Sequence, residues 1–387
     1  MGLSRRLQSL IVESPFVGVK WLRRADLRRQ LFNDTAMGSE SAVLQDSTSQ
    51  TLVADANQKS KHALAEALQM ERIQISSPIF RFQAAAAQKR YAIDCFHLSD
   101  GKLVLADYCG RMFLCDADMR HMATMPNLQK PKLKPISLFV PSANADDHPN
   151  NAAGSLYVME SIPNPEKVGS MQPSNQFEVF EYHKPSRTYE NPWHCRLLLP
   201  PPFVRDPALT PQKISSYAVV GSNICISTLC NDTYFLDTAS DTWTEVGKGK
   251  LPFYGKVEYV PELKLWFGIS SQAKHLAAAD LSAMDYQPQL VGDWREFELP
   301  PEWLEYRDSQ LVNLGLGKFC IARFLETMSM ASDETIDRIV VFTGVEVMPA
   351  MHDGNCSGSG NGKVKLQMKR HKSRFHVCNG ATIDAVF

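Results

Sequence analysis

Histidine and carboxylate side chains are the groups through which this chain could bind a metal ion or perform acid–base chemistry. The ten histidines show no spacing typical of metal ligands. His371 and His376 are five residues apart, but lysine and arginine flank them, which disfavours a cation. His97 and His121 could meet across a sheet, yet no third ligand accompanies them. A structural or surface role is therefore predicted for these histidines.

The motifs that mark known catalytic or phosphate-binding sites are missing from the sequence. There is no G-x-S-x-G elbow, no Walker loop and no H-E-x-x-H motif. Residues 354–362 are rich in glycine but lack the Lys-Ser/Thr pair and the following helix that phosphate binding needs. This segment is interpreted as a flexible loop. The sequence therefore predicts a protein that is not an enzyme, with no catalytic, cofactor-binding or metal-binding residues and no cofactor.

Three aspartates recur at equivalent places, each directly after a short apolar run. They are Asp116, Asp237 and Asp280. Aspartate side chains accept hydrogen bonds from the backbone two residues later, so a recurring aspartate predicts a turn rather than a catalytic pair. Trp243 follows Asp237 within one hairpin and is predicted to pack between neighbouring repeats.

Two basic segments have alternative interpretations. Residues 363–374 contain six lysine or arginine residues, with a cluster that includes Lys369, Arg370 and Lys372, and a second set of arginines flanks Asp26. The leading interpretation of the first segment is a solvated edge strand whose lysines prevent edge-to-edge aggregation. The alternatives are a nuclear-import patch or a contact for an acidic partner.

Composition narrows the class of protein. The chain has 387 residues, 44% of them hydrophobic and 21% charged, with a formal net charge of −1. This balance argues against binding to nucleic acid or to an anionic membrane surface. The nine cysteines form no CxxC pair and several lie within apolar runs, which favours a reducing compartment. Without a recognisable signal peptide or membrane span, a cytoplasmic location is predicted, with the nucleus as the alternative.

Short strands in groups of four are the main structural signal. Turns rich in Gly, Asp and Pro separate runs of apolar and β-branched residues. The predicted groups are 91–98, 102–107, 111–116 and 121–125; 136–140, 155–160, 176–182 and 195–199; 214–220, 223–228, 233–236 and 242–246; 256–260, 265–270, 275–280 and 294–298; and 311–314, 318–325, 338–347 and 363–371.

This repetition predicts an all-β fold, a single β-propeller domain over residues 1–387 with six four-stranded blades. Strands near residues 10–12 and 17–27 begin the remaining blade, and Leu31-Phe32 is predicted to start another strand. Residues 382–387 are predicted to pair with the first segment and close the ring. Residues 33–69 form an inserted segment, predicted to be mobile or partly helical. A pair of β-sandwich domains is the alternative architecture.

The sequence also resembles known families. The segment that runs from Phe235 to Val246 and on to Gly268 resembles a Kelch repeat, with an aromatic strand leading into Asp237 and Trp243 soon after, although the Gly-Gly pair is missing. Motifs such as D-A-D-M-R-H-M-A-T-M-P-N at 116–127 and L-G-K-F-C-I-A-R-F at 316–324 are similar to those of uncharacterised, Kelch-like plant proteins that carry a domain of unknown function. This resemblance implies a propeller fold and brings no established activity.

The predicted function is that of a non-catalytic intracellular scaffold that binds another protein. The contact surface is expected in the loops that differ between repeats, at 144–154, 163–175 and 350–362. One alternative is a propeller enzyme with its site in the central channel. Another is a substrate receptor for ubiquitin ligation, although residues 1–60 contain no helical module of the F-box kind.

Overall fold

The computed structural model describes most of the chain. The described residues are 7–16, 18–32, 70–84, 93–99, 101–142, 153–185, 190–206, 208, 211–230, 232–282, 288–299, 301, 303–327, 338–350, 365–378 and 380–387. The predicted insertion at 33–69 and most of the predicted loops at 144–154 and 350–362 lie outside these residues.

Antiparallel four-stranded units dominate the described residues, as the turn spacing predicts. The first three units along the chain comprise β5 (Ile93–Ser99), β6 (Lys102–Asp107), β7 (Met112–Asp116) and β8 (His121–Thr124); β9 (Pro135–Pro141), β10 (Gly154–Glu160), β11 (Ser174–Tyr182) and β12 (Trp193–Leu198); and β13 (Ile214–Val220), β14 (Asn223–Thr228), β15 (Asp232–Asp237) and β16 (Thr242–Lys248).

The remaining units follow the same plan. They comprise β17 (Phe253–Val260), β18 (Leu265–Ser270), β19 (Leu276–Ala279) and β20 (Leu290–Trp294); β21 (Trp303–Gly315), β22 (Lys318–Thr327), β23 (Arg338–Pro349) and β24 (Leu366–Val377), with β3 (Glu71–Arg72) added at the β24 edge; and β25 (Thr382–Val386), β1 (Gln8–Glu13), β2 (Val19–Ala25) and β4 (Phe80–Gln83). A parallel pairing of β13 with β17 merges two units into one eight-stranded sheet.

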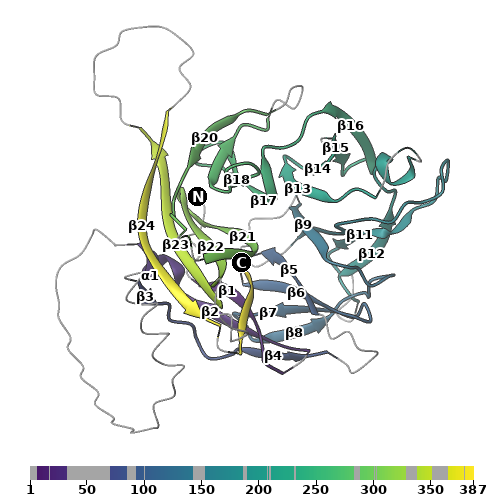
Figure 1. Ribbon diagram of the computed structural model, residues 1–387. Helices are drawn as coiled ribbons and strands as arrows, with labels where there is room; N and C mark the ends of the chain where they lie inside the picture. Colours follow the sequence, from purple (N-terminus) through teal and green to yellow (C-terminus); the bar gives the residue numbers. More distant parts are fainter. Residues whose placement is uncertain are drawn as a thin grey trace, which may run out of the picture.

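The sheets are arranged around a common centre, as Figure 1 shows. A hydrophobic cluster fills the space between each unit and the next. A further cluster joins the unit that begins with β21 to the unit that contains β1, with Leu10 and Phe342 as members. Packing therefore continues around a complete ring. The fold is the predicted all-β propeller.

The ring is closed by strands from the two ends of the described chain. β25 pairs with β1 in antiparallel register, with Leu10 opposite Val386, so the last strand forms the innermost position of a unit whose other strands come first in the sequence. This confirms the predicted pairing of residues 382–387 with the first segment. Closure covers the strand edges that would otherwise remain unpaired.

Two predicted strands are wrong. The segment at Leu31-Phe32 belongs to a short helix, α1 (Leu27–Leu31), because the Asp26 side chain accepts a hydrogen bond from the Arg29 amide and caps its first turn. The fourth strand of the β17 unit ends at Trp294, where the sequence predicted that it begins. Glu296 leaves the sheet because its buried carboxylate accepts hydrogen bonds from Arg323. A short 3-10 helix, η1 (Pro202–Arg205), precedes β13.

The two ends of the ring need names. Each innermost strand begins at the side of the ring where the connection from the preceding unit enters. We call this side the entry end and the opposite side the exit end. Turns within an antiparallel unit alternate between ends, which places the β10–β11 loop at the entry end and the β7–β8 turn at the exit end. No helix among the described residues is long and apolar enough to cross a membrane.

Candidate functional site

The three recurring aspartates shape turns, as predicted. Asp116 Oδ1 accepts hydrogen bonds from the amides of Asp118 and Met119, at 3.0 and 2.9 Å. Asp237 and Asp280 likewise accept from the amides two residues later, at 3.0 and 2.9 Å. Each carboxylate is therefore committed to its own turn, which confirms the structural interpretation of the repeat.

Trp243 packs between units, as the sequence predicted. Its ring lies against the cluster shared by the β9–β12 and β13–β16 units, and its Nε1 donates to the Leu199 carbonyl 2.9 Å away. Trp266, on β18, also contacts the preceding unit, donating to the Val219 carbonyl at 2.9 Å. Each indole therefore joins its own unit to the one before it.

The histidines that the sequence analysis considered in pairs lie in different surroundings. His97 lies on β5 and His121 on β8, at opposite edges of one sheet. His371 pairs with Glu346 at 3.0 Å and packs against the Phe32 ring, while burial lowers the pKa of His376. Within the described ranges, no group of three or more His, Cys, Asp or Glu side chains could hold a metal ion.

The basic segment lies on β24, at a sheet edge. Lys369, Arg370 and Lys372 are exposed there, and β3 covers only Arg374 and Phe375. Arg374 pairs with Glu71 at 2.7 Å. The placement fits the predicted edge strand; nuclear import or contact with an acidic partner through this segment stays untested.

A central cavity with a volume of about 1510 Å³ runs between the innermost strands. Every unit contributes to its lining, through β5, β9, β13, β17, β21 and β25. Charged side chains that contact the lining come mostly in pairs, such as Lys256 with Glu258 at 2.8 Å and Arg307 with Asp384 at 2.6 Å. The cavity is large enough for a small ligand or an inserted side chain.

The closing strand carries the most heavily charged part of this wall. Asp384 binds both Lys20 and Arg307, and Arg307 Nη1 also donates to the Asp384 carbonyl at 2.7 Å. Burial alone would raise the pKa of Asp384, but the two cations outweigh burial and lower it. Asp94 lies within the field of Lys20 and Asp384, and burial raises its pKa to about 6. This cluster holds β25 against its neighbours.

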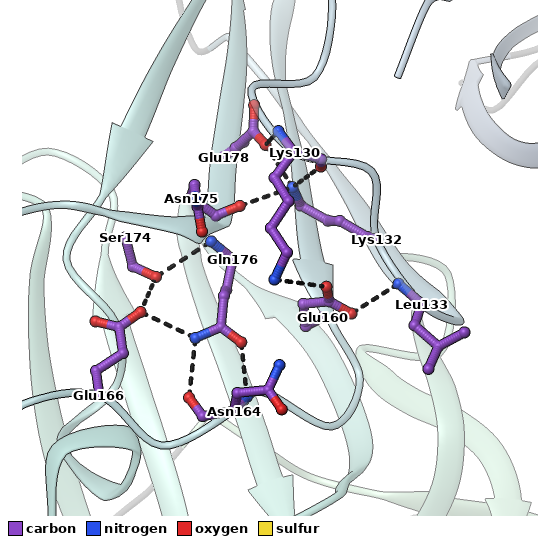
Figure 2. Close-up of polar contacts among 10 residues, drawn as sticks. All are labelled: Lys130, Lys132, Leu133, Glu160, Asn164, Glu166, Ser174, Asn175, Gln176 and Glu178. Atoms are coloured by element: carbon purple, nitrogen blue, oxygen red, sulfur yellow. Dashed lines mark hydrogen bonds and ion pairs between the residues drawn. The ribbon is translucent and has the colours of Figure 1, made fainter. Parts of the chain in front are cut away.

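The β10–β11 loop, residues 161–173, is held by a dense polar network at the entry end (Figure 2). Gln176 on β11 donates to the Asn164 carbonyl and to Glu166, both at 2.9 Å, and accepts from the Asn164 amide at 2.6 Å. Glu166 also accepts from the Ser174 hydroxyl. The base of the loop is therefore fixed to the sheet by side-chain bonds as well as by its covalent ends.

Arg205, at the end of η1, braces the same loop from the neighbouring connection. Its guanidinium binds Glu166 at 3.0 Å and donates to the carbonyls of Ser170 and Gln172. The Glu166 amide returns a bond to the Val204 carbonyl at 2.9 Å. Although burial would raise the pKa of Glu166, its hydrogen bonds to Ser174, Gln176 and Arg205 lower it, so the carboxylate stays charged.

A buried ion pair lies beneath this region. The side chains of Lys132 and Glu178 have 0% exposure, and Lys132 Nζ donates to the Glu178 carboxylate. Lys132 Nζ also donates to the carbonyls of Lys130 and Asn175, each 3.2 Å away. Glu178 also accepts from the Gln129 amide at 2.9 Å. Burial lowers the pKa of Lys132, and Glu178 opposes that shift. The pair fixes the β8–β9 connection to β11.

Apolar side chains project from the same entry end. The exposed fractions are 66% for Leu133, 48% for Ile162, 65% for Val168 and 83% for Met171. The Leu133 amide donates at 2.8 Å to the side chain of Glu160, which lies two residues before Ile162 in the chain. We call these four residues the loop surface. The sequence pointed to the loop at 163–175 by its length, but no sequence signal identified Arg205 or Lys132 as its supports.

The fold and this surface together define a β-propeller protein whose described residues offer a braced, partly apolar loop and no assembled metal site. Residues 5–376 match the family described as a protein of unknown function, DUF1668. The chain belongs to this family. No curated protein matches the chain.

Solved structures show only distant similarity. The β-propeller domain of Cps50 (Swd1) from Myceliophteria thermophila has 12% identity and a TM-score of 0.31, covering 54% of this chain and 62% of that one. An auxiliary nutrient binding protein from Bacteroides ovatus has 11% identity and a TM-score of 0.33, covering 64% and 52%. A structural genomics protein of unknown function from Bacteroides thetaiotaomicron has 10% identity and a TM-score of 0.33, covering 62% and 54%. These matches span less than two thirds of each solved chain, and no argument rests on them.

Proposed function

We propose that this chain is a non-catalytic scaffold that binds another protein through the loop surface at the entry end of its propeller. The observation that carries the proposal is the combination of exposed Val168 and Met171 with the bracing of their loop by Arg205 and Glu166. Single exposed apolar residues are ordinary on protein surfaces. Apolar side chains held on a rigid loop are less ordinary and suit a binding surface.

The bracing supports binding because it removes an entropic cost. A free loop loses conformational entropy when a partner orders it, and this loss weakens the complex. Here the carbonyls of Ser170 and Gln172, on either side of Met171, are already held by Arg205. The loop is therefore organised before a partner arrives, and burial of its apolar side chains can contribute about 25 cal/mol per Å² of apolar area.

Charge around the loop surface favours one kind of partner. Lys134 and Lys167 are exposed, and no carboxylate among the described residues pairs with either. The nearby carboxylates Glu160, Glu166 and Glu178 are engaged by other groups of the protein. A partner segment that presents apolar side chains next to Asp or Glu would complement this surface.

The location, the Kelch-like relationship and the source of the protein are inferred mainly from the sequence. The scattered cysteines, free where the structure describes them, support an intracellular, cytoplasmic location, and the basic segment at 363–374 supports the nucleus as the alternative. A Kelch-like relationship and a plant source follow from the resemblance of motifs. An enzyme that uses the central cavity and a receptor for ubiquitin ligation remain the alternative functions.

Photo-crosslinking tests the proposal. A photoreactive amino acid at position 168 should capture a specific protein in source tissue extract, and the double variant V168S/M171S of tagged protein should reduce recovery of that protein by about tenfold. The matched control is M119S, because Met119 is 76% exposed in the β7–β8 turn at the exit end. Equal recovery by V168S/M171S and M119S would contradict the proposal, as would the absence of any crosslink specific to position 168.

A further inference from the structure

Two lysines converge on one tyrosine at the wall of the central cavity. Tyr254, on β17, lines the cavity. Lys213 Nζ lies 2.6 Å from the Tyr254 hydroxyl oxygen, and Lys274 Nζ lies 4.4 Å from the centre of the Tyr254 ring. The lysines come from the connection before β13 and the β18–β19 turn, so three separate segments meet at this point.

The positive charges of Lys213 and Lys274 are not balanced by carboxylates of the described residues. Among the residues that the structure describes, no carboxylate lies within 4.0 Å of the ammonium group of Lys213 or Lys274. Arg323 donates to the Lys274 carbonyl at 2.9 Å, and its own carboxylate partners are Glu296 and Glu305. Two ammonium groups around one neutral ring repel each other, and an anion placed between them would relieve that repulsion.

The hydrogen-bond donors of Tyr254 and the two lysines also favour an anion at this position. The Tyr254 oxygen accepts from Lys213, which leaves the hydroxyl proton free to be donated to another group. Lysine ammonium groups carry three donors each, and Lys213 uses one on the tyrosine. The cluster therefore offers donors from three side chains and no acceptor that matches them.

The cluster is continuous with the loop surface. The Ile214 amide, next to Lys213, donates to the carbonyl of Ser161, next to Ile162, at 2.8 Å. The Leu229 amide donates to the Lys213 carbonyl at 3.0 Å, and the Leu229 side chain is exposed. A protein that covers Ile162 and Leu229 would thus reach Lys213 at the edge of the cavity.

We propose that Tyr254, Lys213 and Lys274 form a binding site for an anionic group, a carboxylate or a phosphate. The group would accept hydrogen bonds from the tyrosine hydroxyl and from both ammonium groups, and its charge would offset theirs. Its source is either a free small anion in the cavity or an acidic side chain of a bound protein. The site rests on its own contacts and does not depend on the protein-binding proposal.

Titration calorimetry with two named probes tests this site and separates the two sources. The probes are inorganic phosphate and a hexaglutamate peptide, each titrated into the full-length protein at low ionic strength. Saturable binding of phosphate supports a free anion, and saturable binding of the peptide alone supports an acidic side chain. We expect K213Q/K274Q to weaken binding at least tenfold and Y254F to weaken it about threefold.

The matched control is K256Q, which removes a lysine that lines the central cavity two residues from Tyr254 and is already paired with Glu258. K256Q should change affinity by less than twofold. The site would be overturned if wild-type protein bound neither probe saturably, or if K256Q lost as much affinity as K213Q/K274Q. Thermal unfolding of each variant checks folding, and we expect no loss of stability for K274Q because Lys274 is exposed.

Discussion

Two of the clusters of buried charge in this ring differ in what they connect. The side chains of Lys132 and Glu178 are fully buried beneath the loop surface, and their polar contacts stay within residues 129–195. Asp384 joins segments that are far apart in the chain, binding Lys20 of β2 and Arg307 of β21. The first cluster supports one local surface, whereas the second supports closure of the whole ring.

The clusters also differ in how well their charges are compensated. Each donor of Lys132 Nζ has an acceptor, and Glu178 accepts from backbone amides as well. At the closing strand, burial raises the pKa of Asp94, and the field of Lys20, which Asp94 shares with Asp384, opposes that rise only in part. Full compensation makes the first cluster sensitive to the loss of one partner. Incomplete compensation makes the second sensitive to pH.

The largest effect is expected when the fully buried pair loses its cation. K132M leaves the Glu178 carboxylate buried without its counter-ion, and such losses cost about 3–5 kcal/mol of unfolding free energy. Urea unfolding followed by tryptophan fluorescence measures it. Lys130 is the matched control, since its pair with Glu160 at 3.8 Å is partly exposed and K130M should cost less than about 1 kcal/mol.

A second variant tests the same prediction if K132M fails to fold. In K132M/E178Q the carboxylate charge is removed together with its partner, so part of the lost stability should return. Equal stability of K132M and K130M would show that the buried pair contributes no more than the exposed one.

The next largest effect is expected at the closing strand. R307M removes the ion pair with Asp384 and the bond from Nη1 to the Asp384 carbonyl, and charged hydrogen bonds of this kind contribute about 1–3 kcal/mol. Amide hydrogen exchange in β25 should accelerate more than exchange in β14. R338M, which disrupts an exposed pair with Glu326, is the control. Unchanged exchange in β25 would remove Arg307 from the closure.

The pH dependence of Asp94 gives a smaller effect of opposite sign. Its pKa is about 6 in the folded protein against an ordinary 3.8, so the folded state binds this proton more tightly. Stability from the protonated acid is complete below pH 3.8 and is lost as pH rises through 6. D94N should therefore be more stable than wild type above pH 6, by about 1–2 kcal/mol, and equally stable below pH 4. A constant difference across this range would contradict the assignment.

The sequence predicted the repeat well because the turns and strands of each repeat depend on residues that are close together in the chain. Asp116, Asp237 and Asp280 bind amides two residues away, and such turns depend on neighbouring residues only. The alternation of apolar residues marks most strands for the same reason. The wrong prediction at Leu31-Phe32 arose because two apolar residues fit a strand or a helix, and the capping by Asp26 decided between them.

The supports of the candidate site were not predictable because they come from distant segments. Arg205 reaches Glu166 across 39 positions, and Lys132 reaches Glu178 across 46. No spacing rule connects such residues before the fold is known. The loop at 163–175 was predicted as a surface because its length differs from other loops, but its rigidity follows from packing. Lys213 and Lys274 likewise meet only at Tyr254.

The smallest effect on stability is expected at the loop surface itself, and that small effect is informative. V168S and M171S should each change the unfolding free energy by less than about 0.5 kcal/mol, because side chains exposed by 65% and 83% bury little area in the folded protein. R205M should destabilise more, since Arg205 holds two loop carbonyls and Glu166. Urea unfolding compares the three. A loss above 1 kcal/mol in V168S would place this side chain in the core of the loop, where it could not also be an available contact for a partner.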